Sequence, residues 1–506
     1  MRYFFFTILL LPSFLLIAQD TFIHPYGADV NLMVFTRMIL DNDTLVISGN
    51  VTNTQLSNQS GMLIAKIDTS GNLIWAKAHY AHDGLNYSKT SNQKGLVKAP
   101  DSSGYFALGH LFEHSTGVLI KYDNNGNFLW QKEYPDDNSL QDYYETIVVL
   151  EDGLFILGSK YLLNGLRSTF LMKVDFEGEL LWQHYYDGGE RNRGFSSFLK
   201  LNENEFVIGE GTTSPSSGNQ PNDTFQPIIT GIDSDGNILW EWEGPLSQDE
   251  SGAVGLYHDY EGNWIYKSGK SRIFQDGTFV VQPSFVKRDA DFNLISTTYY
   301  DTLDYARNNF YDMIHLQSGG FLAVGHNTED TTGIPPFDRY RFGWMMRLDA
   351  DGNTLWERLD LTPIDTFATA NYWTTAVELE SGSIIAVGTA RTAINGHLKD
   401  WGSLIKVDKN GCIEMSCAIT GIDIPEVVQK SVNIYPNPFY NQINIESQGK
   451  YQVAIYNIYG QRVFYQPEVE DFARLNLSGL LPGSYFVQLI FEDGQRVVKV
   501  VKGSGI

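Results

Sequence analysis

Aromatic and arginine side chains gather in segments that connect repeated units of this chain. A glycan-binding or peptide-binding site uses such groups, because an aromatic face offers apolar contact and polar side chains fix the orientation of the ligand. Solvated loops also contain these residue types, so they are candidates only. The candidate ligand-binding residues are Tyr143, Tyr144, Arg191, Arg193, Tyr305, Arg307, Tyr372 and Trp373.

Signs of catalysis are weaker. The sequence has no His-Glu-x-x-His zinc motif, no Gly-x-Ser-x-Gly nucleophile elbow, no phosphate-binding loop and no dinucleotide fingerprint. Loop carboxylates could form a glycosidase pair, but they are also the ordinary background of surface loops. We therefore predict no catalytic residues, no metal and no cofactor, and we expect a binding protein rather than an enzyme.

The two cysteines, Cys412 and Cys417, lie five residues apart. In an exported chain two close thiols pair more often than they bind metal, since a metal site needs two further ligands and none is evident nearby. We expect these cysteines to form a small disulfide clip.

An internal repeat positions these residues. In its clearest copy, residues 171–182, an apolar run is followed by Asp175, by Gly178 three residues later and by Trp182 after four more. Five copies are complete and two are degraded, with a period of about 52 to 60 residues. The repeated aspartates are Asp68, Asp123, Asp175, Asp233, Asp289, Asp349 and Asp408.

Each copy reads as four short strands. An apolar run ending in glycine precedes every aspartate, as at residues 154–158 and 321–325, and another short run precedes that one. The Asp-x-x-Gly-Asn element resembles the start of a calcium loop, but we favour a hairpin turn in which the aspartate accepts hydrogen bonds from its own backbone. The repeated tryptophan is interpreted as a packing residue between units.

Seven four-stranded units at this period predict an all-β, seven-bladed β-propeller over residues 30–417. Six or eight blades remain open if an end copy is incomplete. The connections between second and third strands and between blades are the longer ones, and in an up-and-down blade they emerge on one face. We expect that loop-rich face to carry the function.

Composition excludes some partners. The formal net charge of -24 repels phosphate, so nucleic acid is not expected as a partner. The apolar run from Tyr3 to Ala18 is short and is followed by polar residues, which favours a signal peptide at residues 1–19 over a membrane anchor. No later stretch of the sequence is long and apolar enough to predict a transmembrane segment.

The repeat stops before a linker at residues 418–430, and residues 431–506 read as five or six short strands, enough for a small immunoglobulin-like β-sandwich. This part resembles the type A C-terminal sorting domain of the type IX secretion system of Bacteroidetes. The motifs that carry the resemblance are Tyr435, Pro436, Asn437 and Pro438, then Tyr459 and Gly460, then Pro482, Gly483 and Tyr485.

The resemblance implies export through the periplasm to the cell surface or the medium. It also implies two partners for residues 431–506, the outer-membrane translocon and a sortase-like peptidase that can attach cargo to lipopolysaccharide. The propeller resembles uncharacterised repeat propellers carried by such cargo, which implies architecture and no chemistry.

We therefore expect a secreted or cell-surface protein whose propeller presents a loop-rich face to a glycan or a protein. The alternative is a secreted polysaccharide hydrolase or lyase that uses the propeller channel, and a structural role at the cell surface is a third interpretation.

Overall fold

The computed structural model describes most of the chain after residue 20, and it divides into two compact units, Met1–Met415 and Ser416–Ile506. The predicted signal peptide and linker lie outside the described residues. The described residues are 21–27, 32–53, 59–88, 94–135, 139–163, 165–186, 192–213, 225–247, 249–273, 279–300, 308–329, 340–362, 368–394, 397–413, 432–457, 462–491 and 494–503.

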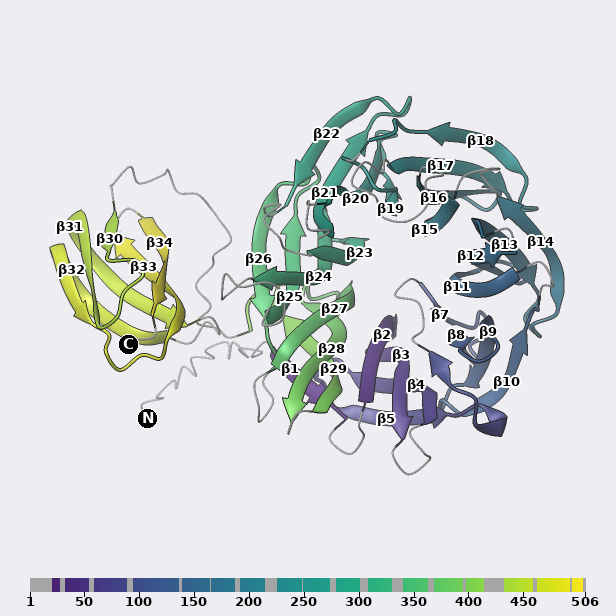
Figure 1. The fold of residues 1–506 in the computed structure, drawn as a ribbon, viewed down its shortest axis with the longest axis horizontal. Helices are drawn as coiled ribbons and strands as arrows, with labels where there is room; N and C mark the ends of the chain where they lie inside the picture. The colour runs from purple at the N-terminus through teal and green to yellow at the C-terminus, as the bar shows by residue number, and fades with distance from the viewer. Residues whose placement is uncertain are drawn as a thin grey trace, which may run out of the picture. The chain divides into compact units, whose positions relative to one another are not determined.

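Within its described residues the first unit is a ring of seven antiparallel blades, each with its first strand nearest the centre (Figure 1). Blade one contains β2 (Leu32–Asp41), β3 (Thr44–Asn53), β4 (Gln59–Asp68) and β5 (Leu73–His79); blade two contains β6 (Tyr87–Ser88), β7 (Leu96–Lys98), β8 (Gly104–Leu111), β9 (Thr116–Asp123) and β10 (Phe128–Glu133), preceded by the 3-10 turn η2 (His82–Gly84); blade three contains β11 (Ser139–Val149), β12 (Leu154–Leu162), β13 (Arg167–Val174) and β14 (Leu180–Tyr186).

The second half of the ring repeats this order, except that its last blade takes a strand from the N-terminus. Blade four contains β15 (Asn192–Lys200), β16 (Glu205–Thr213), β17 (Phe225–Asp233) and β18 (Ile238–Glu243); blade five contains β19 (Val254–His258), β20 (Trp264–Ile273), β21 (Phe279–Arg288) and β22 (Leu294–Tyr299); blade six contains β23 (Asn309–His315), β24 (Phe321–Glu329), β25 (Tyr340–Leu348) and β26 (Thr354–Asp360); blade seven contains β27 (Ala368–Glu378), β28 (Ile384–Ile394), β29 (His397–Val407) and β1 (Phe22–Tyr26).

Strand β1 closes the ring. It pairs antiparallel with β29, so the outer strand of the last blade comes from the start of the chain. Because β1 lies before residue 30, where the sequence analysis begins the propeller, the propeller extends further toward the N-terminus than that range. A ring joined in this way has no free seam between its first and last blades.

The repeated residues join neighbouring blades. A Cβ atom added at Gly126 of blade two would lie 2.4 Å from the Trp75 ring of blade one, and one at Gly178 of blade three would lie 2.8 Å from the Trp130 ring of blade two. A tyrosine at the end of the outer strand adds a hydrogen bond: Tyr134 Oη donates to the Gly178 carbonyl at 2.8 Å. The repeated tryptophan therefore packs between blades, as the sequence indicated.

In β1 the same two places are taken by Phe22 and Tyr26. The Phe22 ring lies against Gly71 of blade one, and Tyr26 Oη donates to the Gly71 carbonyl at 2.6 Å. The turn before Gly71 is held by Asp68, whose carboxylate accepts hydrogen bonds from the Ser70 and Asn72 backbone nitrogens at 2.9 and 2.8 Å. The aspartate thus binds its own turn.

In five blades the glycine that ends the apolar run faces a β-bulge in the innermost strand. A Cβ atom at Gly388 would lie 1.7 Å from the Tyr372 carbonyl oxygen, and one at Gly325 would lie 1.8 Å from that of Asn309. Such approaches exclude any side chain, so glycine is required there. The bulges insert one extra residue per strand and redirect the residues that follow them.

The C-terminal unit is a small all-β domain whose five strands, within the described residues, are hydrogen-bonded in the order β30-β31-β33-β34 with β32 on β31. A shift in register between Glu446 and Lys450 interrupts the long pairing of β31 with β32. The strands are β30 (Asn433–Tyr435), β31 (Gln442–Asn457), β32 (Arg462–Asn476), β33 (Gly483–Phe491) and β34 (Gly494–Lys502). The predicted all-β architecture, with a propeller followed by a small β-rich domain, is confirmed.

Candidate functional site

The innermost strands of five blades place equivalent residues around the central channel, each directly after a bulge. In three blades the residue is small and hydroxylated, namely Thr146 of β11, Ser197 of β15 and Thr375 of β27. In the other two it is charged, Arg37 of β2 and Asp312 of β23. These two charged residues depart from the pattern that the other three blades share. A functional site is expected at such a departure, because residues common to all blades serve the packing of the propeller.

The Arg37 side chain of blade one and the Asp312 side chain of blade six form an ion pair beside blade seven. Arg37 Nη1 donates to Asp312 Oδ2 at 2.7 Å, and Thr375 Oγ1 donates to the same oxygen at 2.8 Å. Burial opposes ionisation of Asp312, but the charges of Arg37 and Lys94 and the hydrogen bonds outweigh it and hold its pKa below the usual range. Asp312 is therefore a carboxylate that ties blades one, six and seven together.

Two lysines approach the same carboxylate from other blades. Lys267 of β20 is buried and its Nζ donates to the Phe310 carbonyl at 2.5 Å; burial lowers its pKa to about 8, partly offset by Asp312. Lys94, just before β7, keeps an exposed side chain. Its pKa is lowered by burial among protein atoms and by the Arg37 charge. The described part of the channel thus gathers three cations around one carboxylate.

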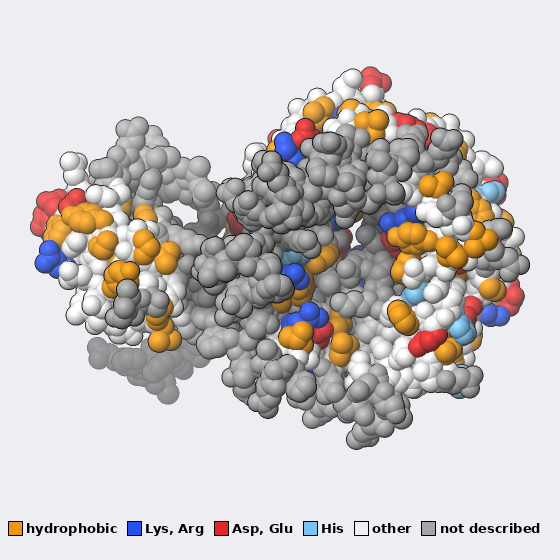
Figure 2. All heavy atoms as spheres, viewed as in Figure 1, with side chains coloured by type: hydrophobic (Ala, Val, Ile, Leu, Met, Phe, Trp, Pro, Cys, Tyr) orange, Lys and Arg blue, Asp and Glu red, His pale blue; other side chains and the backbone are white. Residues whose placement is uncertain are grey.

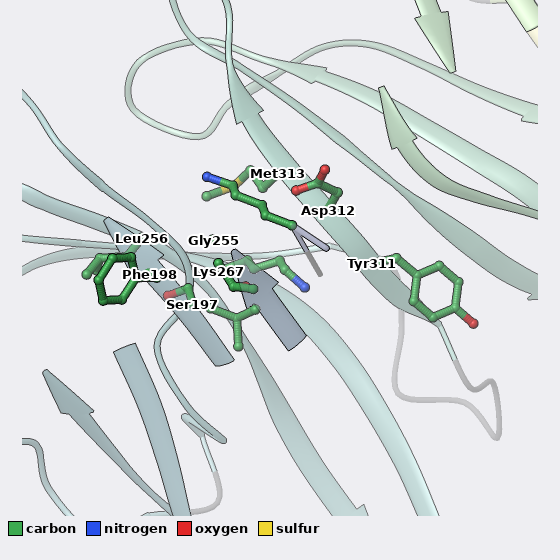
Figure 3. A pocket seen from close by; sticks show the side chains of 11 residues that line it. Ser197, Phe198, Gly255, Leu256, Lys267, Tyr311, Asp312 and Met313 are labelled. Carbon is green, nitrogen blue, oxygen red and sulfur yellow. The ribbon is translucent and has the colours of Figure 1, made fainter. Parts of the chain in front are cut away.

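A cavity of about 30 Å³ lies between these groups, lined by residues of blades two to six. Figure 3 shows Ser197, Phe198, Lys267 and Asp312 around it, with the Tyr311 ring set apart from them. Gly255 lies beside Lys267, and because glycine has no side chain the lysine can extend toward the next blade. The surface of the molecule is hollowed at the middle of the propeller, and basic and acidic side chains border the hollow (Figure 2).

A second ionisable pair lies in β11 and β13. Glu145, the extra residue of the β11 bulge, accepts hydrogen bonds from Ser159 Oγ at 3.0 Å and Arg167 Nη2 at 3.3 Å. Burial raises the Glu145 pKa to about 7, although Arg167 and Ser159 act against the rise. A carboxyl group that titrates near neutrality can serve as a general acid or base.

The structure places three of the predicted ligand-binding residues inside the protein, which corrects the interpretation of them as rim contacts. Trp373 is 0% exposed and Tyr144 is 3% exposed, and both are the core aromatics that precede a bulge. Arg193 is buried and pairs with Glu210 at 2.6 Å and Glu241 at 2.8 Å. Their side chains pack or neutralise charge within the propeller, so a ligand cannot reach them.

Two predicted residues are half-buried on innermost strands. Tyr143 stacks on His110 with ring centres 4.9 Å apart, and the Tyr372 hydroxyl accepts a hydrogen bond from Arg341 Nη1 at 2.6 Å. The structure does not bring them together in one site. Arg191, Tyr305 and Arg307 lie outside the described residues, as do the longest of the predicted rim loops.

The sequence analysis missed Arg37, Lys94, Glu145, Lys267 and Asp312. An alignment of the repeats shows the signal for two of them, since Arg37 and Asp312 follow the aromatic residue by two positions, where other copies have serine or threonine. Among the described residues no group of three or more His, Cys, Asp or Glu side chains could hold a metal ion. Cys412 is disulfide-bonded, and its predicted partner, Cys417, lies outside the described part of the chain.

In the C-terminal unit the motif residues hold the ends of the sheet. Asn437 Oδ1 accepts a hydrogen bond from the Val501 backbone nitrogen at 2.8 Å, and Tyr485 Oη donates to the Leu481 carbonyl at 2.6 Å, beside Pro482 and Gly483. Tyr435, which precedes Pro436, donates to Glu446 on β31. Tyr459 and Gly460 are not among the described residues.

A family model described as the secretion system C-terminal sorting domain matches residues 433–503. Residues 433–503 form a sorting domain. A sorting domain of this kind directs export by the type IX secretion system, so the protein is secreted or exposed at the cell surface after passing through the periplasm. The helices that the structure describes include none long and apolar enough to cross a membrane.

A search of curated proteins finds no match. Solved structures match the propeller part weakly. The polysaccharide lyase Uly1 has a TM-score of 0.43 at 8% identity, over 74% of this chain and 90% of that one. The GH93 alpha-L-arabinofuranosidase of Fusarium graminearum gives 0.39 at 12% identity, over 60% and 92%. An oligogalacturonate lyase in complex with manganese gives 0.39 at 13% identity, over 76% and 91%. Similarity at this level concerns the fold alone, and no functional argument rests on it.

Proposed function

We propose that the protein is cargo of the type IX secretion system whose propeller binds a saccharide outside the cell, with the central channel as the binding site. The proposal depends mainly on one observation. The repeat keeps the same kinds of residue around the channel, yet Arg37 and Asp312 stand where other blades have small hydroxylated residues, and Asp312 lines a cavity. Three of the blades fold with serine or threonine at this position, so the repeat itself does not require a charge there.

A binding role fits this arrangement better than hydrolysis. The carboxylate of the cavity, Asp312, is held ionised by Arg37 and Thr375, so it cannot donate a proton. Glycoside cleavage needs one protonated and one ionised carboxyl group on either side of the scissile bond. Among the described residues that line the cavity Asp312 has no second carboxyl group beside it.

The second candidate function is a hydrolase or lyase that uses the channel, with Glu145, the neighbour in β11 of the cavity residue Thr146, as the group that transfers the proton. Its pKa of about 7 suits proton transfer at neutral pH. If the protein cleaves a saccharide, we expect Glu145→Gln to abolish cleavage, because the amide keeps the shape and cannot exchange the proton.

The test uses the mature full-length chain on an array of glycans and polysaccharides, with retention and release of reducing ends followed together. Retention without release is the expected result. Release that Glu145→Gln abolishes would replace the binding proposal with the enzymatic one. A chain that neither retains nor cleaves any saccharide on the array would overturn both and favour a protein partner or a structural role.

A further inference from the structure

The charges of the channel do not balance. Arg37, Lys94 and Lys267 surround Asp312, and the groups that donate hydrogen bonds to that carboxylate are Arg37 and Thr375. Lys267 turns its ammonium to a backbone carbonyl, which neutralises no charge. The described part of the channel therefore holds an excess of positive charge, in a chain whose formal net charge is -24.

Lys94 is the cation with least compensation. Among the residues that the structure describes, its ammonium group has no hydrogen bond and no ion pair. Arg37 repels it and Asp312 attracts it, and the attraction is shared with Arg37 and Lys267. The Lys94 side chain is exposed and lines the cavity, so an incoming anion can reach it.

Two other buried cations of the propeller are neutralised by ion pairs with glutamates. Arg193 has Glu210 and Glu241 within 2.8 Å, and Arg288 has Glu250 at 2.6 Å. A buried charge without such a partner is costly. Within the described residues, however, Arg347 and Lys406 are buried and donate to backbone carbonyls without an ion pair, as Lys267 does, and Lys66 and Lys98 share the single carboxylate of Asp41. The channel differs from these places because its two lysines line a cavity that an anion can enter.

The cavity sets the size of the group that binds. About 30 Å³ is room for roughly two water molecules, enough for the oxygens of a carboxylate or a sulfate and too little for a sugar ring. Thr146 and Ser197 line it in addition to the two lysines, and the Ser197 hydroxyl donates to the Ala253 carbonyl at 3.1 Å. Only the charged end of a ligand enters, and the rest must lie in the wider channel.

We propose that Lys94 and Lys267 form an anion-binding site at the cavity of the central channel, where Arg37 neutralises Asp312, and that the site takes a carboxylate or sulfate substituent of an acidic saccharide. This inference rests on the proposed function, since it names the class of saccharide that the channel binds. The strongly negative protein repels dense polyanions at long range. The site therefore selects short or sparsely charged acidic saccharides.

Isothermal titration calorimetry on the mature full-length chain tests this with three probes. They are trigalacturonate, its fully methyl-esterified form, which is the same sugar without charge, and a sulfated carrageenan tetrasaccharide. We expect an acidic probe to bind and the ester to bind at least tenfold more weakly, because hydrogen bonds to charged groups are lost. Binding of trigalacturonate identifies a carboxylate as the natural group, and binding of the sulfated probe alone identifies a sulfate.

The variant Lys94→Gln separates the site from general electrostatics. We expect it to weaken the acidic probe about tenfold or more, whereas Lys77→Gln, an exposed lysine on outer strand β5, leaves the affinity unchanged. Without ligand, Lys94→Gln should be at least as stable as the parent chain, because it removes repulsion with Arg37. Equal weakening by both variants would overturn the site.

The outcomes separate this inference from the function on which it rests. If the ester and the acid bind equally well, or if only neutral saccharides are retained on the array, the channel binds saccharides without an anion site and this inference is wrong. If no saccharide of any kind is retained, the proposed function itself fails. Loss of acidic binding in Lys94→Gln with an unchanged unfolding midpoint establishes the site.

Discussion

Closure of the propeller by β1 predicts how one hydroxyl group contributes to stability. In Tyr26→Phe the donor to the Gly71 carbonyl is lost, and nothing else changes in size. Burial raises the pKa of Tyr26, so the donor is present throughout the working range of pH. Removing one partner of such a bond costs about 1 kcal/mol, or about a fivefold change in the ratio of folded to unfolded protein.

A matched control exists within the ring. Tyr134 makes the same bond to Gly178 between blades two and three, where the chain is continuous. We expect Tyr134→Phe and Tyr26→Phe to lower the free energy of unfolding by similar amounts. Phe22→Ala removes a half-buried ring that lies on Gly71, and about 2 kcal/mol is expected, roughly half of the cost at a fully buried site.

The assay is urea unfolding of the mature chain followed by tryptophan fluorescence. All ten tryptophans lie between residues 75 and 401, so the signal reports on the propeller and not on the sorting domain. A shift of the midpoint at constant slope measures the change in stability. If Tyr134→Phe lowers the midpoint and both Tyr26→Phe and Phe22→Ala leave it unchanged, β1 is not the outer strand of blade seven and the reasoning is refuted.

Three further predictions concern the glycine opposite a bulge, an ionisable carboxyl group and the disulfide. Gly388→Ala should lower the unfolding midpoint far more than Gly165→Ala. A Cβ at Gly388 would lie 1.7 Å from the Tyr372 carbonyl oxygen, whereas a Cβ at Gly165 meets no atom within 4 Å. Equal shifts of the midpoint in the two variants would contradict this prediction. Folding raises the Glu145 pKa to about 7 from its ordinary value near 4.5, so the folded state binds this proton more tightly than the unfolded state does. The free energy of unfolding therefore has its full value below about pH 4.5 and falls by on the order of 3 kcal/mol as the pH rises to about 7. Glu145→Gln should flatten this part of the stability profile measured by urea unfolding, and an unchanged profile would assign the pH dependence to other groups. Cys412→Ser should lower the free energy of unfolding by about 2 kcal/mol, which is the loop-closure entropy of a bond to Cys417. Reduction of the parent chain should lower it by the same amount. A larger effect of reduction than of substitution would contradict that pairing.

The architecture could be predicted because each repeat carries its own local rules. The aspartate and glycine of Asp-x-x-Gly fix a turn, and the glycine opposite the bulge and the tryptophan over the next turn recur in sequence. Such features depend on neighbours within one or two blades. They are visible without knowledge of the whole ring.

Strand β1 and the channel charges depend on distant parts of the chain. The spacing of Phe22 and Tyr26 matches that of Trp130 and Tyr134, but no Asp-x-x-Gly turn precedes Phe22, so the match is too short to stand alone. Lys267 is on a second strand and reaches the channel because the pairing of β19 with β20 shifts after Val254. No pattern in a single repeat encodes that shift.

The errors among the predicted ligand-binding residues have one physical cause. Tyr144 and Trp373 were placed on the rim because they adjoin loops between blades, yet each is the aromatic residue that fills the core before a bulge. Residue type alone does not distinguish an aromatic ring that binds a ligand from one that fills a core. Position in the repeat does, because an aromatic shared by several blades belongs to the scaffold.

The same comparison between blades shows that the channel residues Arg37 and Asp312 differ from the pattern of the scaffold. A ring of identical units needs no ion pair across its axis, since bulges, glycines and tryptophans already fix each blade against the next. Arg37 and Asp312 cost desolvation that serine and threonine would not. An unequal number of opposite charges does not identify a site by itself, because Arg193 has two glutamates and Asp41 has two lysines. The feature of the channel that ring closure leaves unexplained is the position of Lys94 and Lys267 at the wall of a cavity, where an anionic ligand can reach both.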